Sequence, residues 1–251
     1  MIISTLNGGL GSQMCQYAAG RTLADKLGTD LYLDLSWYKL NAKDTKRDYL
    51  LDRFNIRAKE IEGNVNINIY KEPTLFYNEI PLIDNIKLIG YFMNYRYCDK
   101  SMYKDFEPTK EAGITDTQFL KTNYISIHIR RGDKVNSQKH YALDLDYYLK
   151  AMLMIEREID EFEYSVFSDD IEYCTSNLTA KYDMITFVNN DEITDLILQS
   201  YCKHNIIANS SFSWWAAILN QNPDKIVIAP KKYYRDSEEN YDIYPKEWRL
   251  I

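Results

Sequence analysis

Sulfur and imidazole ligands are scarce in this sequence. Its 251 residues include four cysteines and three histidines. The cysteines are scattered with no CxxC pair, so we expect reduced, buried thiols instead of a disulfide framework. No histidine is paired with a neighbouring His, Cys or Glu at the spacing of metal ligands, which argues against a zinc site. The residues concerned are Cys15, Cys98, Cys174, Cys202, His128, His140 and His204.

Long apolar runs are absent as well. No window approaches the ~20 consecutive apolar residues that cross a bilayer. The opening residues MIISTLNGG have neither a basic region nor enough apolar length for a signal peptide. These absences predict a cytoplasmic protein without a transmembrane segment, and they leave peripheral contact with a membrane open.

Positive charge is in deficit. The chain has 30 Lys and Arg against 37 Asp and Glu, a formal net charge of −7, and a pI of about 5.1. General nucleic-acid binding needs an extended basic surface, so we predict no nucleic-acid partner. A small anionic ligand would have to be held by a local basic cluster against the overall field of the protein.

The sequence does contain a regular alternation of strands and helices. Its composition, 45% hydrophobic and 27% charged, is enough for one large domain or two small ones. In the second half, runs rich in β-branched residues alternate with segments of helical periodicity, which predicts a parallel sheet covered on both faces. The predicted strands are 124–129, 163–168, 184–189, 205–210 and 225–230, and the predicted helices are 144–159, 169–178, 191–202 and 210–220.

The first half begins in the same way. The predicted elements are a strand at 2–6, a turn at 7–11, a helix at 12–27, and strands at 30–35 and 86–92. Apolar residues at i+4 spacing, from Cys15 to Leu27, give this helix a core stripe, and Gly28 is placed to end it. The charged stretch 41–84 gives only weak signals for any element.

No proline- or glycine-rich linker marks a domain boundary. The polar stretch EPTKEAGITD, residues 107–116, is the best place for one. We therefore predict an N-terminal α/β lobe of residues 1–115 and a C-terminal α/β lobe of residues 116–251.

The segment GGLGSQ joins the first predicted strand to the first helix. Gly8, Gly9 and Gly11 let the backbone approach a ligand, and the free amides at a helix start favour an anion. The alternative is a tight turn with Ser12 as the helix N-cap. The third glycine of the dinucleotide-binding fingerprint is missing, because position 14 is Met14.

The segment HIRRGD, residues 128–133, lies at the carboxyl end of a predicted central strand. Ligands of open α/β sheets bind at the carboxyl ends of the strands, and arginine binds phosphate oxygens through paired hydrogen bonds. Gly132 permits a tight turn, and Asp133 either orients an arginine or accepts a proton. The alternative is that one arginine is solvated and the other is paired with Asp133.

Two more polar motifs follow later strands. FSDD supplies Asp169 or Asp170 either as a helix cap or as a carboxylate that accepts hydrogen bonds from a nucleobase. NSSFSWWAA supplies Ser210 and Ser211, which are N-cap candidates whose hydroxyls and amides are expected to face the same sheet edge. The four motifs together offer arginines, helix N-termini, hydroxyls and a carboxylate. This combination suits a nucleotide diphosphate whose phosphate is the leaving group.

Two further features have structural interpretations. The triplet DLD imitates the DxD metal motif of some nucleotide-sugar enzymes, but it precedes the helical run YYLKAMLM. We therefore interpret Asp144 as an N-cap and not as a metal ligand. We expect Trp214 and Trp215 to pack in the core.

The motifs in their chain order resemble a known family. NGGLGSQMCQYAAGRTLADKLG, IGYFMNYRY, HIRRGD, VFSDD and NSSFSWWAA, from residue 7 to about 217, look like the motif series of glycosyltransferase family 11, the α-1,2-fucosyltransferases. HIRRGDKV is also similar to an arginine motif of other enzymes that use GDP-fucose. The resemblance implies an α/β fold of two facing Rossmann-like domains (the GT-B arrangement), inversion at the anomeric carbon, and no required metal or other cofactor. It makes the N-terminal lobe the acceptor side and the C-terminal lobe the GDP-fucose-binding side.

The resemblance also implies roles for individual residues. Arg130 matches the arginine that binds the β-phosphate of the donor and stabilises its charge as the glycosidic bond breaks. His128 and Arg131 belong to the same donor-site motif, and Asp169 matches an acidic residue that contacts guanine in related enzymes. The other matching donor-site positions are Gly9, Gly11, Ser12, Ser210, Ser211 and Phe212.

The sequence departs from the family pattern at several positions. Ser12 stands where asparagine is usual, and Cys15 stands where phenylalanine is usual. Gln138 occupies the place of the glutamate credited as the base in α-1,6 enzymes, so that role does not transfer. Asp133 is our candidate for the general base. A carboxylate within 41–84 and His140 are the alternatives.

The reaction implied by the resemblance is transfer of L-fucose from GDP-β-L-fucose to the 2-hydroxyl of a terminal β-galactoside. The expected partners are GDP-fucose and a galactose-terminated oligosaccharide. Two alternatives stay open: a transferase of the same fold with another nucleotide sugar or linkage, and a non-catalytic sugar-nucleotide binder.

Overall fold

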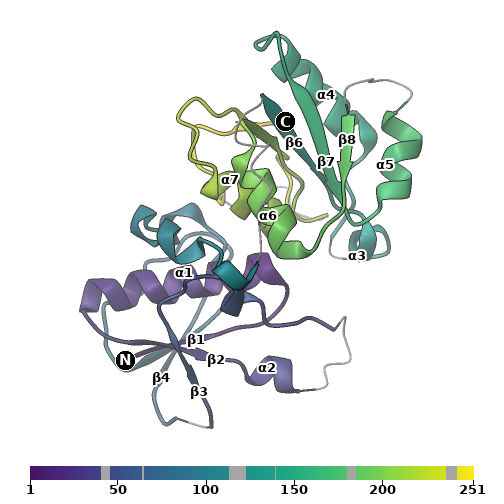
Figure 1. The fold of residues 1–251 in the computed structure, drawn as a ribbon. Coiled ribbons are helices and arrows are strands. Elements are labelled where there is room, and N and C mark those ends of the chain that lie inside the picture. Colours follow the sequence, from purple (N-terminus) through teal and green to yellow (C-terminus); the bar gives the residue numbers. More distant parts are fainter. Residues whose placement is uncertain (41–45, 64, 113–122, 139, 180–184, 236–241) are drawn as a thin grey trace. The chain divides into compact units, whose positions relative to one another are not determined.

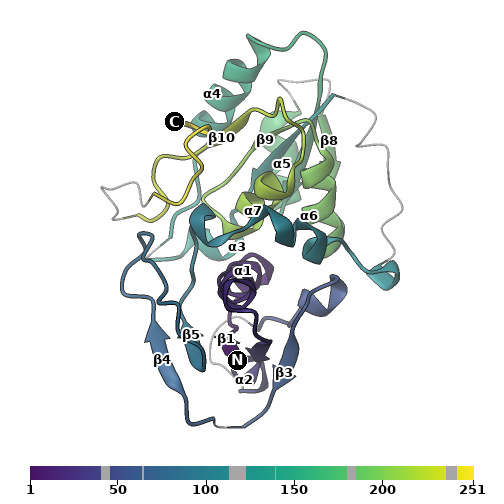
Figure 2. The same ribbon diagram turned by 90° about the vertical axis from the view of Figure 1, so that its left-hand side faces the viewer.

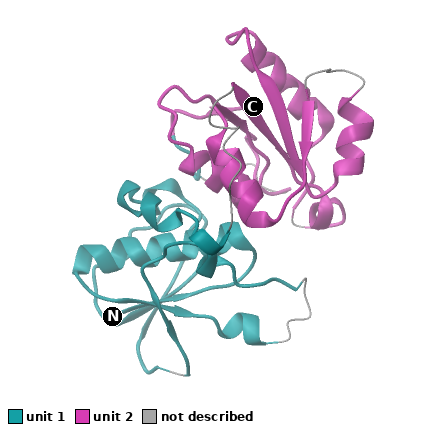
Figure 3. Ribbon diagram, in the orientation of Figure 1, with its two compact units in different colours: residues 1–113, 241–245 teal, residues 114–240, 246–251 magenta. Residues whose placement is uncertain are grey.

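The computed structural model describes the chain except for residues 41–45, 64, 113–122, 139, 180–184 and 236–241 (Figure 1). The chain forms two compact units. Unit 1 comprises residues 1–113 and 241–245, and unit 2 comprises residues 114–240 and 246–251 (Figure 3). The predicted lobe boundary at 115/116 lies outside the described residues. Residues 241–245 belong to unit 1, whereas the predicted lobes place them in the C-terminal lobe.

Unit 1 is built on a parallel sheet in the order β3-β2-β1-β5-β4. Two of its edge strands lie within the stretch 41–84, where the sequence gives only weak signals. They are short and mostly exposed, so no apolar pattern marks them. The strands are β1 (Ile2–Thr5), β2 (Leu31–Asp34), β3 (Lys59–Ile61), β4 (Asn68–Lys71) and β5 (Ile86–Ile89), and the short helices are α2 (Ser36–Lys39), η1 (Leu51–Arg53), η2 (Tyr95–Tyr97), η3 (Lys100–Phe106) and η4 (Lys110–Ala112).

Helix α1 (Leu10–Leu27) begins two residues before its predicted start. Its N-cap is Gly9, which has no side chain to cap with, so the interpretation of Ser12 as N-cap is wrong. The amides of Ser12 and Gln13 instead donate to the Gly9 carbonyl at 3.0 and 3.1 Å. The helix ends as predicted at Gly28, whose φ of 63° is the left-handed conformation that glycine adopts readily.

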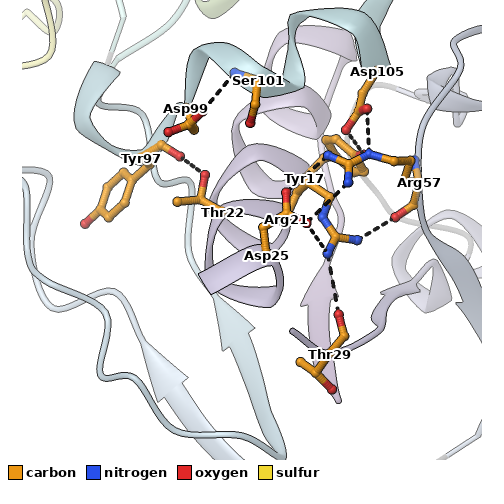
Figure 4. A network of polar contacts seen from close by, with 10 residues as sticks. All are labelled: Tyr17, Arg21, Thr22, Asp25, Thr29, Arg57, Tyr97, Asp99, Ser101 and Asp105. Atoms are coloured by element: carbon orange, nitrogen blue, oxygen red, sulfur yellow. Dashed lines mark hydrogen bonds and ion pairs between the residues drawn. The ribbon is translucent and has the colours of Figure 1, made fainter. Parts of the chain in front are cut away.

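Helix α1 is buried on most of its circumference and not along a single stripe. Part of the reason is a polar network on one side of it (Figure 4). The Tyr17 hydroxyl donates to Asp105 at 2.6 Å and accepts from the Arg57 amide at 2.9 Å. Arg21 donates to the Arg57 carbonyl at 2.9 Å and pairs with Asp25 at 2.8 Å. Burial and the bond to Asp105 raise the pKa of Tyr17, so its hydroxyl keeps its proton and remains a donor.

Unit 2 is a six-stranded parallel sheet in the order β8-β7-β6-β9-β10-β11. Numbered along the chain, this is the order 3-2-1-4-5-6 of a doubly wound nucleotide-binding sheet, and it reverses between β6 and β9. The strands are β6 (Tyr124–Ile129), β7 (Glu163–Ser168), β8 (Ile185–Val188), β9 (His204–Ile206), β10 (Val227–Ala229) and β11 (Arg249–Leu250).

The predictions for unit 2 hold residue for residue at β6 and β7. The predicted strand 205–210 is too long, because β9 ends at Ile206 and the chain then leaves the sheet. Asp144 caps α4 by accepting from the Tyr147 amide at 2.9 Å, which confirms its predicted role. The helices are α3 (Gly132–Val135), α4 (Leu145–Glu156), α5 (Ile171–Leu178), α6 (Glu192–Tyr201) and α7 (Ser211–Leu219).

Helices cover both faces of the unit 2 sheet. On one face, Ile127 of β6 belongs to a core cluster with Met152 of α4 and Leu178 of α5. On the other face, Phe167 of β7 packs with Leu198 of α6, and α7 lies beside α6 (Figure 2). The indoles of α7 are fully buried, as predicted for core side chains. None of the helices in the described parts of the chain has the length and apolar character that crossing a membrane requires.

Candidate functional site

The ends of β6 and β7 bring three of the predicted site residues together in unit 2. Arg130 follows the last residue of β6, and Asp169 follows the last residue of β7. The Nη1 atom of Arg130 lies 2.8 Å from Asp169 Oδ2. Its Nε and Nη2 atoms donate to Asp133 Oδ1 at 3.1 and 2.7 Å. The guanidinium is thus held between two carboxylates at the carboxyl edge of the sheet, where ligands of such sheets bind.

Arg131 takes a different direction. Its Nε donates to Asp170 Oδ2 at 3.0 Å, and its guanidinium carbon lies 3.5 Å from the centroid of the Tyr173 ring. Asp170 also caps α5, because its Oδ1 accepts from the Tyr173 amide. Of the two aspartates that the sequence leaves open, Asp170 is therefore the cap. The side chain of Arg131 braces the first turn of α5, while its main-chain amide donates to Asp169 Oδ1 at 2.9 Å.

Gly132 is required by the close approach of Asp169. A Cβ atom at position 132 would lie 2.4 Å from Asp169 Oδ2 and 3.2 Å from its Cγ. The carboxylate thus fills the space where any other residue would carry its side chain. The turn predicted for this glycine is present, and it begins the short helix α3.

His128 is buried beside Phe212, with 5% of its surface exposed and the two ring centroids 5.3 Å apart. Its Nδ1 atom is buried and has no hydrogen-bond partner among the described residues. Burial is the main cause that lowers the pKa of His128 to about 3, and the positive charges of Arg130 and Lys134 lower it further. The imidazole is therefore neutral at physiological pH and adds no charge to the site.

The neutral state of His128 predicts a pH dependence of stability. Its pKa is lower in the folded state than in the unfolded chain, where it is about 6.5, so acid favours unfolding by roughly 1.4 kcal/mol per pH unit below that value. The free energy of unfolding of the wild type should fall by about 2 kcal/mol more than that of His128→Phe when the pH is lowered from 6.5 to 5. Urea unfolding at the two pH values measures this difference. His204, with a pKa lowered to about 4, contributes equally to both proteins. Equal slopes for the two proteins would contradict the prediction.

The segment after β9 leads into α7. Ser210 is the N-cap residue by its extended backbone, but its side chain makes no capping hydrogen bond. The hydroxyl of Ser210 is therefore not used as a cap, and Ser211 begins the helix. The first amides of α7, with the positive end of the helix dipole, lie after the strand next to β6. This arrangement favours an anion near Ser210, Ser211 and Phe212.

Lys134 is a site residue that the sequence reasoning missed. Only 6% of it is exposed, its ammonium donates to the Asn209 carbonyl, and it lies 5.5 Å from the centroid of the Tyr233 ring. Burial and the nearby charge of Arg130 lower its pKa to about 8. A single lysine after a charged turn normally points into water, so only its place at the end of HIRRGDK connects it with the site.

In unit 1, the glycine loop follows β1 and is fixed by two side chains. Gln13 donates to the Gly8 carbonyl at 3.3 Å and to the Asp48 carbonyl at 2.8 Å, and its oxygen accepts from the Leu50 amide at 2.9 Å. The Tyr38 hydroxyl donates to the same Gly8 carbonyl at 3.0 Å. The loop is therefore held by the fold and does not depend on a ligand for its shape.

Gln16 joins the loops that follow two neighbouring strands, β1 and β5. Its oxygen accepts from the Asn7 amide at 2.9 Å, and its nitrogen donates to the Gly90 carbonyl at 3.1 Å. The predicted donor residues Gly9, Gly11 and Ser12 are also in unit 1, at the start of α1. The other predicted site residues are in unit 2.

The described part of the unit 2 site has no evident metal-binding group. Within the described ranges, no three His, Cys, Asp or Glu side chains are gathered as a metal site requires. At this edge of unit 2, Arg130 and the buried Lys134 carry positive charge, and Asp133 and Asp169 are the carboxylates beside them.

Comparison with known proteins gives a consistent assignment. The model of glycosyl transferase family 11 matches residues 112–251. The O-antigen biosynthesis glycosyltransferase WbnK of Escherichia coli is 33% identical over 94% of this chain and 96% of its own length. An alpha-1,2-colitosyltransferase of Escherichia coli is 29% identical over 100% of this chain and 99% of its own. The galactoside 2-alpha-L-fucosyltransferase Sec1 of Mus musculus is 26% identical over 87% of this chain and 64% of its own.

A solved structure resembles the fold without close sequence similarity. The fucosyltransferase NodZ from Bradyrhizobium superposes with a TM-score of 0.56 over 87% of this chain and 92% of that chain, at 12% identity. At this identity the likeness shows the fold alone.

Proposed function

The chain belongs to glycosyltransferase family 11, and on that premise we propose that it transfers L-fucose from GDP-β-L-fucose to the 2-hydroxyl of a terminal β-galactoside. The observation that carries the proposal is the position of Arg130. It lies at the carboxyl end of β6, where the strand order reverses, and the start of α7 follows the neighbouring strand. A diphosphate bound there would meet a guanidinium and the amides of a helix N-terminus.

In the proposed reaction the acceptor 2-hydroxyl attacks the anomeric carbon of fucose with inversion. The bond from that carbon to the phosphate oxygen breaks, GDP leaves with the electron pair, and a base takes the hydroxyl proton. Arg130 stabilises the charge that develops on the leaving phosphate, and such a donor supplies about 3–4 kcal/mol of barrier lowering. Because this cation offsets the charge, we propose that no metal is required.

Donor binding has to release Arg130 from its present partners. Asp133 and Asp169 bind the guanidinium of Arg130 in the way that phosphate oxygens would. We propose that the β-phosphate replaces the Asp169 carboxylate on Arg130. Asp169 then accepts hydrogen bonds from the guanine edge, as the family resemblance implies.

We extend the proposal to the arrangement of the two units. Two parallel sheets, each with a reversal of strand order, suit the two Rossmann-like domains of the GT-B arrangement. In this proposal, unit 2 is the GDP-fucose-binding lobe and unit 1 is the acceptor side, while Gly9, Gly11 and Ser12 keep the donor-loop role that the resemblance implies.

A second donor is favoured by one specific relative, the colitosyltransferase that matches this chain over its whole length. Purified protein should therefore be tested with GDP-fucose and with GDP-colitose, using lactose as acceptor, with and without EDTA. We expect fucosyl-lactose as the main product, with EDTA causing no loss. Faster transfer from GDP-colitose would replace the proposed donor. No turnover with either donor, together with a GDP-induced rise in Tm, would identify a non-catalytic binder.

The role of Asp133 as general base gives a separate prediction. Its Oδ1 binds Arg130, and its side chain is 48% exposed at the edge that carries this arginine. Asp133→Asn should keep donor binding and lower kcat by about 10²- to 10⁴-fold, the usual contribution of a general base. Single-turnover assays with saturating GDP-fucose would measure this loss. An unchanged kcat with weaker donor binding would show that Asp133 only orients Arg130.

A further inference from the structure

Lys134 connects the two chain segments on either side of the strand-order reversal. It belongs to the turn after β6, and its ammonium donates to the carbonyl of Asn209, in the segment after β9. Asn209 is fully buried, and its amide nitrogen donates to the Tyr141 and Tyr233 carbonyls at 3.0 and 3.1 Å. Ser210, the N-cap of α7, follows directly. The contact of Lys134 therefore links the start of α7 to the turn that carries Arg130.

The burial of this ammonium is unfavourable for the fold. Among the described residues it has a single hydrogen-bond acceptor, although a lysine carries three donors. The nearest carboxylates, Asp133 and Asp169, already bind Arg130, whose charge repels that of Lys134. Replacing a buried charge by an apolar side chain of similar volume is often neutral or stabilising. The presence of the charged Lys134 at this buried position thus indicates a role other than stabilising the fold.

We propose that Lys134 is a positioning residue for the nucleotide diphosphate. Its charged ammonium holds the Asn209 carbonyl and thereby fixes the start of α7 beside Arg130 in the geometry that binds the donor phosphates. Loss of the charge loosens this segment and weakens donor binding. The inference rests on the proposed function, because it takes GDP as the ligand of this edge.

The first test replaces Lys134 by methionine, which has similar length and no charge. Lys134→Met should unfold at the same Tm as the wild type or higher, because the buried charge is gone. It should nevertheless bind GDP on the order of tenfold to a hundredfold more weakly in calorimetry, the range for loss of a hydrogen bond from a charged group. Wild-type GDP affinity in this variant would overturn the proposal. A lower Tm with unchanged GDP affinity would assign Lys134 to the fold instead.

Lys225 offers a matched control at the opposite end of α7. Its ammonium also donates to main-chain carbonyls, those of Ala217 and Asn220, at 2.7 and 2.6 Å. These carbonyls lie at the C-terminal end of the helix, where a cation is favourable. Lys225→Met should lower the Tm and leave GDP affinity within about twofold of the wild type, because distant sites act independently. Equal losses of GDP affinity in both methionine variants would overturn the proposal.

A second test uses the proton of Lys134. The charged and titratable groups that face it are Arg130, Asp133, Asp169, Tyr233 and His128, and His128 stays neutral over the tested range. Its pKa of about 8 means that the wild type loses this charge as the pH rises past that value, so GDP affinity should fall between pH 7 and about pH 9.5. Lys134→Arg keeps its charge and should show a flat profile over this range. The same fall in both proteins would contradict the role of the charge.

These outcomes separate the inference from the proposed function. If the wild type binds GDP and Lys134→Met binds it equally well, the inference about Lys134 is wrong and the proposed donor site stands. If the wild type fails to bind GDP, the proposed function is itself wrong, and the inference is overturned with it.

Discussion

Arg130→Lys is expected to reduce transfer strongly while the protein stays folded. Lysine keeps a positive charge near Asp133 and Asp169, so the ion pairs with these two carboxylates survive in part. A single ammonium, however, cannot bind a phosphate through two parallel hydrogen bonds as a guanidinium does. We expect kcat/KM for GDP-fucose to fall by about 10³-fold, in the range found for donors and arginines that act on transition-state charge. Initial rates and the Tm would be measured on the same preparation.

Arg131→Lys is the comparison for this variant, because it makes the same change one residue later. The Arg131 side chain binds Asp170 and the Tyr173 ring and so supports α5. Arg131→Lys should lower the Tm by a few degrees, corresponding to roughly 1 kcal/mol from the lost stacking and hydrogen bond. Its loss of activity should be much smaller than that of Arg130→Lys. Near-normal turnover of Arg130→Lys, or equal losses in the two variants, would refute the assignment of the chemistry to Arg130.

Gly132→Ala is the second change with a large expected effect. The added Cβ would lie 2.4 Å from Asp169 Oδ2, so either the carboxylate or the turn has to move. Moving Asp169 breaks its bonds to the Arg131 amide and to the Arg130 guanidinium. A displacement of about 1 Å in a catalytic group costs on the order of 10²-fold in rate. We expect kcat/KM to fall by that factor, and stability to fall by about 1–3 kcal/mol from overpacking.

Gly28→Ala is the matched control for a glycine substitution. Gly28 has a φ of 63° and nothing within 4 Å of the added Cβ, so only backbone strain results. It should lose about 1 kcal/mol of stability and keep wild-type kcat/KM. Unchanged kinetics in Gly132→Ala as well would show that the contact of Gly132 with Asp169 has no part in the site.

The sequence predicts the central strands of unit 2 better than the edge strands of unit 1, for a physical reason. All but the first residue of β6 are buried, because helices cover both faces of the sheet, and an unbroken apolar run results. Strands β3 and β4 are short and exposed at the sheet edges, so their side chains carry no burial pattern. Ser12 is only an N-cap alternative, offered by its residue type, whereas the N-cap of α1 is Gly9, because glycine can begin a helix through its backbone.

In the site, too, features that depend on neighbouring residues can be predicted from the sequence, and features that depend on distant segments cannot. HIRRGD and FSDD each follow a readable strand, so the neighbourhood of Arg130 and Asp169 can be inferred from strand order. Which arginine faces the edge depends on the direction of each side chain, and motif letters do not contain this information. The burial of Lys134 depends on Asn209 and Tyr233, which belong to distant segments of the chain. No local pattern around Lys134 could therefore predict it.

The separation of these segments also bears on how the protein folds. Lys134 and Asn209 are 75 residues apart in the chain, yet β6 and β9 are adjacent in the sheet. Contacts of such high sequence separation form slowly, because a long loop has to close before they are gained. During synthesis, the arginine turn leaves the ribosome well before its partner on the other side of the strand-order reversal. The sheet edge that carries Arg130 is therefore among the last parts of unit 2 to be completed, and until then the turn after β6 lacks the segment that contains Asn209.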